Sequence, residues 1–104
     1  MRANVVNAKN EVTLEVEGSL KGPWVLELER AWMEAARADL AKAVHVNLTA
    51  VGFVDNEGRI LMEDMAKAGV KLIAAGPMMK AIVEDVLERV HEKQRVPGNG
   101  DRAA

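Results

Sequence analysis

Apolar and polar positions alternate with a period of two near the start of the chain, as in a strand with one buried face. The apolar positions are Val12, Leu14 and Val16, and the polar ones are Glu11, Thr13, Glu15 and Glu17. A shorter strand is predicted at residues 4–7, and residues 8–10 have the composition of a turn, in which Asn10 can take a left-handed conformation. The two strands are therefore expected to form an antiparallel hairpin.

A helical period follows the breaker segment GSLKGP at residues 18–23. Pro23 suits the first position of a helix, because its missing N–H would have no partner there in any case. The apolar residues then recur at helical spacing, at Val25, Leu28, Trp32, Ala36 and Leu40. This pattern predicts an amphipathic helix over residues 23–40 with its apolar stripe facing the core.

The middle of the chain predicts a strand, a loop and a second helix. The strand, residues 43–48, has apolar residues at alternate positions, namely Val44, Val46 and Leu48. Residues 49–55 are expected to form a loop, and a helix is predicted over residues 56–68, ended by Gly69. The apolar side of this helix is predicted to consist of Ile60, Leu61, Met65 and Ala68. Met62 falls off that stripe and is expected to be exposed.

A compact apolar segment at residues 70–75 predicts a further strand, and Gly76-Pro77 predicts the start of a third helix. The apolar stripe of that helix is Ile82, Val83, Val86, Leu87 and Val90. The order β-β-α-β-α-β-α predicts an α/β fold, with a mixed sheet of about four strands and three helices packed on it. We expect one domain over residues 1–92, and a disordered polar tail over residues 93–104.

Composition narrows the possible partners. The 104 residues fit one domain, and a net charge of -2 argues against nucleic acid as a partner. No basic run is longer than a dipeptide, which argues against an anionic membrane surface. The chain has no cysteine, which is compatible with a reducing compartment. Its start lacks the apolar core of a signal peptide, and no apolar run approaches the roughly 18 residues of a membrane span. A cytoplasmic protein without membrane insertion is expected.

Residue types that carry common enzymatic chemistry are scarce. No nucleophile motif surrounds the only hydroxyl side chains, which belong to Thr13, Ser19 and Thr49. His45 and His91 are the only histidines, and a metal site is rejected because no third ligand converges with them. Asp55 and Glu57, two positions apart in a helix cap, are expected to point apart rather than form a catalytic pair. The sequence predicts a protein that is not an enzyme, with no catalytic residues and no cofactor.

The stretch VNLTAVGFVDNEG, residues 46–58, is the most informative part of the chain. Asp55 and Asn56 are both residue types that cap helix N-termini, because a short side-chain oxygen can accept from free backbone N–H groups. Glu57 would lie in the first turn, where a negative charge favours the helix dipole. On local physics alone, an ordinary capped strand–helix connection accounts for these residues.

The element order and this stretch resemble the STAS domain, the fold of bacterial anti-sigma factor antagonists and of the cytoplasmic tails of sulfate transporters. The resemblance covers roughly residues 4–90. DNEG at residues 55–58 resembles the family's Asp-Ser-Ser/Thr-Gly turn. GSLK at residues 18–21 resembles the family's Gly-Glu-Leu-Asp turn without its two acidic residues, and GVKLIAAGP at residues 69–77 resembles its penultimate strand and following turn.

The resemblance implies a regulatory module whose second helix docks on a protein partner, often a serine kinase that is also an anti-sigma factor. In that family, phosphorylation of the serine after the aspartate releases the partner. Asn56 stands at this position, and an amide cannot be phosphorylated, so the resemblance carries over the docking surface but not the switch. The residues expected to bind the partner are Phe53, Asp55, Asn56, Glu57, Gly58, Arg59 and Met62, with Glu63 and Lys67 further along the helix.

Two other functions stay open at this point. The same fold could serve as a subunit or accessory protein of a membrane transporter complex. The loops after the strands could also form the pocket of a small-ligand or nucleotide receptor.

Overall fold

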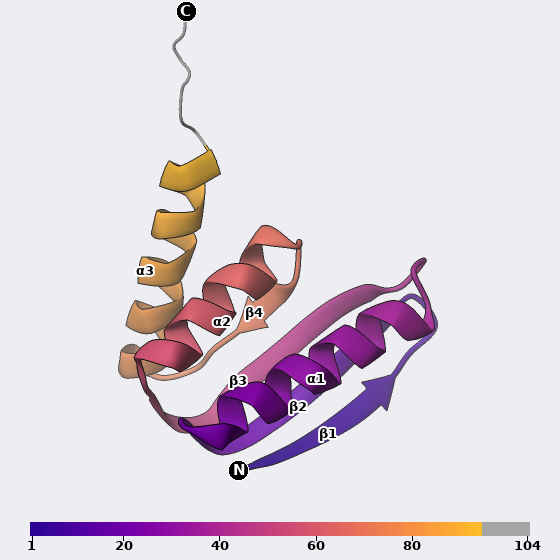
Figure 1. The fold of residues 1–104 in the computed structure, drawn as a ribbon, viewed down its shortest axis with the longest axis horizontal. Coiled ribbons are helices and arrows are strands. Elements are labelled where there is room, and N and C mark those ends of the chain that lie inside the picture. The colour runs from indigo at the N-terminus through magenta and orange to yellow at the C-terminus, as the bar shows by residue number, and fades with distance from the viewer. Residues whose placement is uncertain (95–104) are drawn as a thin grey trace, which may run out of the picture.

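The computed structural model describes residues 1–94, which form four strands and three helices (Figure 1). In chain order the elements are β1 (Arg2–Asn7), β2 (Glu11–Leu20), α1 (Pro23–Ala38), β3 (Ala43–Val54), α2 (Asn56–Lys67), β4 (Lys71–Ile73) and α3 (Pro77–Gln94). The predicted order β-β-α-β-α-β-α and the α/β fold class are confirmed.

The four strands form one mixed sheet in the order β1-β2-β3-β4. β1 and β2 are the predicted antiparallel hairpin, and β2, β3 and β4 run parallel to one another. The crossover helices α1 and α2 lie over the same face of the sheet, and α3 packs beside α2 (Figure 1). The opposite face carries the exposed Glu15 and Glu17 of β2, and no helix of residues 1–94 covers it.

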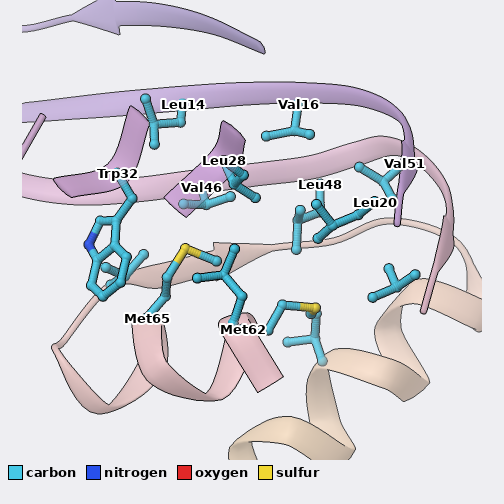
Figure 2. Close-up of a cluster of buried hydrophobic side chains, with 14 of the residues drawn as sticks. Leu14, Val16, Leu20, Leu28, Trp32, Val46, Leu48, Val51, Met62 and Met65 are labelled. Carbon is cyan, nitrogen blue, oxygen red and sulfur yellow. The ribbon is translucent and has the colours of Figure 1, made fainter. Parts of the chain in front are cut away.

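The core lies between the sheet and the three helices (Figure 2). Alternate residues of β2 and β3 form one side of the core, and aliphatic, aromatic and methionine side chains of α1 and α2 pack against them. The fully buried members with the largest side chains are Leu14, Leu20, Leu28, Leu48, Met62 and Met65, with Val46 and Val86. The period of two in β2 therefore predicted its buried face correctly.

β3 is longer than the sequence pattern predicts. The segment after Leu48 was expected to be a loop, but the strand continues to Val54. The register explains this error, because β2 advances from Glu15 to Ser19 while β3 advances two residues further, from Asn47 to Phe53. The two extra residues of β3 form β-bulges, which break the alternation of buried and exposed side chains. The sequence pattern of a strand is therefore lost although the pairing of β3 with β2 continues.

The first helix ends earlier than predicted. α1 ends at Ala38, and Leu40, which was assigned to its apolar stripe, is 88% exposed. Asp39 takes an extended conformation, and its carboxylate accepts a hydrogen bond from the N–H of Ala41 at 3.0 Å. This local turn competes with a further helical turn, so Leu40 never reaches the core.

The last third of the chain shows three further differences. β4 is shorter than the predicted strand at residues 70–75, and Leu87 is 46% exposed although it was assigned to the stripe of α3. α3 continues to Gln94, past the predicted domain boundary at residue 92. The rest of the predicted tail lies outside the described residues. Within residues 1–94, no helix has the length and apolar character needed to cross a membrane.

Candidate functional site

Asp55 ties two turns together at the carboxyl ends of β2 and β3. Its Oδ1 accepts the N–H of Gly58 at 2.8 Å, which caps α2, and its Oδ2 accepts the N–H of Gly22 at 3.1 Å, just before α1. Its own N–H donates to the carbonyl of Leu20 at 3.1 Å. Both helices therefore start from one shared fixed point, and Asp55 acts as a positioning residue whose oxygens are already engaged.

These hydrogen bonds also set the charge of Asp55. The N–H of Gly58, and next the N–H of Gly22, stabilise the carboxylate and lower the pKa of Asp55 below its ordinary value. The charge of nearby Lys21 acts in the same direction. Asp55 is therefore a permanent anion at neutral pH, in contact with the positive end of the α2 dipole.

Gly58 allows α2 to approach the end of β2 closely. A Cβ at this position would lie 2.7 Å from Val54 Cγ1 and 2.9 Å from the carbonyl oxygen of Leu20. Real carbon atoms do not approach so closely, and the backbone carbonyl cannot turn away easily because it accepts from Asp55. Gly58 is buried, so its role is to let the helix dock on the sheet.

Because Gly58 lies on the buried side of α2, the helix turns a different side toward the core than the apolar pattern predicts. The buried side of α2 runs through Gly58, Leu61, Met62 and Met65, at the spacing i, i+3, i+4, i+7. Met62 was expected to be exposed, but it has no exposed area and cannot contact a partner, so that assignment is wrong. Ile60 was assigned to the core and is 46% exposed instead. A stripe that begins with a glycine is hard to find by apolar pattern alone, because glycine contributes no apolar side chain.

Most of the predicted residues that remain at the surface lie at the beginning of α2, whereas Lys67 is exposed at its other end. Glu63, another predicted surface residue, is buried as well. We use the name α2 face for the exposed or half-buried residues at the beginning of α2, namely Phe53, Asn56, Glu57, Arg59 and Ile60. Phe53 is 49% exposed, and the Lys21 ammonium lies 5.9 Å from the centre of its ring. Lys21 and Ile60 were not among the predicted site residues.

An open polar groove of about 600 Å³ continues the α2 face between α2 and α3. Across it Arg59 Nη1 lies 3.7 Å from Asp85 Oδ2, and Arg89 Nε lies 3.2 Å from the same oxygen. These pairs are exposed and stabilise the fold little, so their side chains can rearrange around a partner. The groove is lined by Asn56, Arg59, Ile60, Glu63, Asp64, Lys67, Asp85, Val86 and Arg89.

The remaining candidate residues do not converge. His45 Nδ1 lies 3.6 Å from Glu11 Oε2, on the face of the sheet away from the helices, whereas His91 is exposed on α3. No group of three potential metal ligands occurs among residues 1–94. Thr49 is exposed in the middle of β3 and belongs to no part of the α2 face.

Solved structures of other proteins share this fold. No protein-family model and no curated protein matches the sequence. The structure of the anti-sigma factor antagonist SpoIIAA in its unphosphorylated form aligns with 86% of this chain and 98% of its own, with a TM-score of 0.54 and 20% identity. A crystal structure of Mglu aligns with 71% of this chain, with a TM-score of 0.55 and 20% identity, but the match spans only 19% of the Mglu chain. The STAS-like fold that the sequence resemblance implied is therefore confirmed.

Proposed function

We propose that this chain is a regulatory protein-interaction module of the anti-sigma factor antagonist kind, that it is not an enzyme, and that the α2 face is its docking surface. The observation that carries the proposal is the double hydrogen bond of Asp55, which fixes the start of α2 and leaves Asn56 and Glu57 exposed beside it. The likeness in fold to SpoIIAA supports the same class of function.

The chemistry of the α2 face suits a protein partner. Phe53 and Ile60 provide exposed apolar area, and Glu57 and Arg59 add charges of opposite sign around it. Protein interfaces commonly combine a few aromatic or aliphatic anchors with a polar rim. The adjoining groove offers space for a side chain of the partner that can pair with Arg59 or Asp85.

The docking is proposed to be constitutive. A phosphate at this position would add about two negative charges to the docking surface, but the amide of Asn56 cannot accept one. Asn56 is exposed and neutral, which corresponds to the unphosphorylated, binding form implied by the family resemblance. Glu57 contributes one fixed negative charge to the surface that the partner meets.

Affinity capture from a lysate of the source organism, with detergent-solubilised membranes included, tests the docking surface. The baits are wild type, Glu57→Lys on the α2 face, and Glu15→Lys on the face of the sheet away from the helices. We expect mass spectrometry to find one kinase-like anti-sigma factor with wild type and Glu15→Lys, and its loss with Glu57→Lys. Retention by all three baits would overturn the assignment of the α2 face.

A second experiment tests the missing switch. We expect the captured kinase, supplied with ATP, to phosphorylate Asn56→Ser and to release it, whereas wild type stays unmodified and bound. Phosphorylation of wild type at Thr49 or another hydroxyl, with release, would contradict constitutive docking.

Two other results would replace the proposal. Specific capture of a membrane complex would indicate a subunit or accessory protein of a transporter. A shift in melting temperature with nucleotides at millimolar concentration, with no protein captured, would indicate a small-ligand receptor.

A further inference from the structure

The two edges of the sheet are built differently. β4 has only three residues, and a short edge strand offers little for a further strand to pair with. β1 has six residues, all of them exposed, and it pairs with β2 alone among the strands of residues 1–94. β1 contains no proline or lysine, and its pairing with β2 shows no bulge. It lies beside α1 and is not covered by it (Figure 1). Apart from the charge of Arg2 at its start, β1 therefore lacks the usual devices that protect an edge strand.

The hairpin register identifies which backbone groups of β1 are free. The N–H of Ala8 donates to the carbonyl of Glu11 at 2.8 Å, so Ala8 and Glu11 form a hydrogen-bonded pair. Hydrogen-bonded and non-hydrogen-bonded pairs alternate along an antiparallel ladder. The N–H and C=O groups of Ala3, Val5 and Asn7 therefore point away from β2, toward the open edge.

These free groups are complementary to themselves. When two copies of β1 run antiparallel about a two-fold axis at Val5, Val5 faces Val5 of the second copy and Ala3 faces Asn7. All of these pairs are of the hydrogen-bonded kind, which gives roughly six new backbone hydrogen bonds. The only charge on β1, Arg2, lies at its start, so the two arginines are at opposite ends of the paired strands and do not repel each other closely.

The side chains agree with this pairing. Val5 pairs with Leu14 across the hairpin, so its side chain lies on the same face as the core. Val5 is nevertheless 54% exposed, and it borders a small hollow lined by Val12, Ala31 and Ala35. The two-fold arrangement places a second Val5 beside the first, and it keeps the helices of both copies on one side of a continuous sheet.

We propose that two copies of this chain associate through β1 and form one eight-stranded sheet across a two-fold axis. The interface uses no residue of the α2 face, so it is independent of the proposed docking function. It is small, so we expect a dimer that dissociates on dilution.

Sedimentation equilibrium and amide hydrogen exchange by NMR, each at about 20 µM and about 1 mM protein, test this interface. We expect a monomer at the lower and a dimer at the higher concentration, with exchange at Ala3, Val5 and Asn7 slowed at least about tenfold in the dimer. Asn4 and Val6 donate to β2 in both states and should change little. A monomer at both concentrations, or a dimer without slower exchange at those three amides, overturns the proposal.

Substitutions at Val5 provide the matched controls. Val5→Lys places two positive charges opposite each other, and Val5→Pro removes a central N–H that the monomer leaves free, so both variants should remain monomeric at about 1 mM. Val5→Thr keeps a β-branched side chain and both backbone groups, and should dimerise like wild type. A dimer of Val5→Lys or Val5→Pro would overturn the pairing, provided that the circular dichroism spectrum of the variant is that of the wild type.

Discussion

α2 has two sides that serve different purposes. The buried side, with Gly58 and Met62, fits against Leu20 and Val54 so closely that a Cβ at Gly58 would have no room. On the exposed side, the side chains of Asn56 and Glu57 make no hydrogen bond to the rest of residues 1–94, and Arg59 makes only an exposed ion pair with Asp85. The helix is therefore positioned by its buried side and by Asp55, and its exposed side is available for binding.

The largest expected effect is on the free energy of unfolding, and it distinguishes Met62 on the buried side of α2 from Ile60 on the exposed side. Met62→Ala removes a fully buried side chain and should lower the free energy of unfolding by about 2–5 kcal/mol, because a cavity remains in the core. Ile60→Ala, two residues away, should cost less than about 1 kcal/mol because its side chain is half exposed. Urea denaturation of both variants measures the difference, and equal losses would show that the two sides are not distinct.

The next effect concerns the close approach of α2 to β2. Gly58→Ala should lower the free energy of unfolding by about 1–3 kcal/mol through overpacking against Leu20 and Val54, although alanine is the better helix former. Gly52→Ala is the control, since a Cβ there has no neighbour within 4 Å, and it should change stability by less than about 1 kcal/mol. A Gly58→Ala variant as stable as wild type would contradict the close contact.

Asp55 gives a smaller effect that depends on pH. Because the folded protein lowers the pKa of Asp55, its carboxylate stabilises the fold above the ordinary pKa, and this contribution is lost as the pH falls through the lowered pKa. Asp55→Asn keeps the shape but does not titrate. Wild type should therefore be more stable than Asp55→Asn at neutral pH, and the difference should shrink on acidification. A difference that stays constant down to strongly acidic pH would contradict the stabilising role of the Asp55 carboxylate.

The smallest expected effect on stability is at Glu57. Glu57→Lys loses a favourable interaction with the α2 dipole and should lower the free energy of unfolding by less than about 1 kcal/mol. Glu57→Gln is the matched control for the charge alone. A loss larger than that of Gly58→Ala would mean that Glu57 has a structural role, and the comparison of the two sides would then fail.

The sequence predicted most of the fold because its periodic segments are long and distinct. The alternation of β2, the helical spacing of α1 up to Trp32 and the breaker at residues 76–77 predicted their elements correctly. The breaker predicted at residues 18–23 begins too early, because β2 continues to Leu20. The failures lie where local pattern and tertiary packing disagree. The bulges of β3 hid the second half of a strand, and the turn at Asp39 ended a helix whose pattern continued to Leu40.

The candidate site was only partly predictable for a related reason. Residue type indicated that either Asp55 or Asn56 caps α2, and the structure uses Asp55. Its second hydrogen bond, to Gly22, joins residues 33 positions apart and has no local signal. The rotation of α2 depends on the space that Gly58 leaves, so Met62 and Ile60 were assigned to the wrong sides of the helix.

If the α2 face binds a protein partner and contributes little to folding, substitutions on this face should weaken binding without lowering stability, and a titration measures this. The partner from the capture experiment is purified and titrated calorimetrically with wild type, Asn56→Arg and Glu15→Lys, after equal unfolding free energies have been established. We predict that Asn56→Arg binds at least about 30-fold more weakly than wild type, as expected for a bulky charge at the centre of an interface, while Glu15→Lys binds normally. Equal affinity of all three proteins would contradict docking through the α2 face and place the docking surface elsewhere on the molecule.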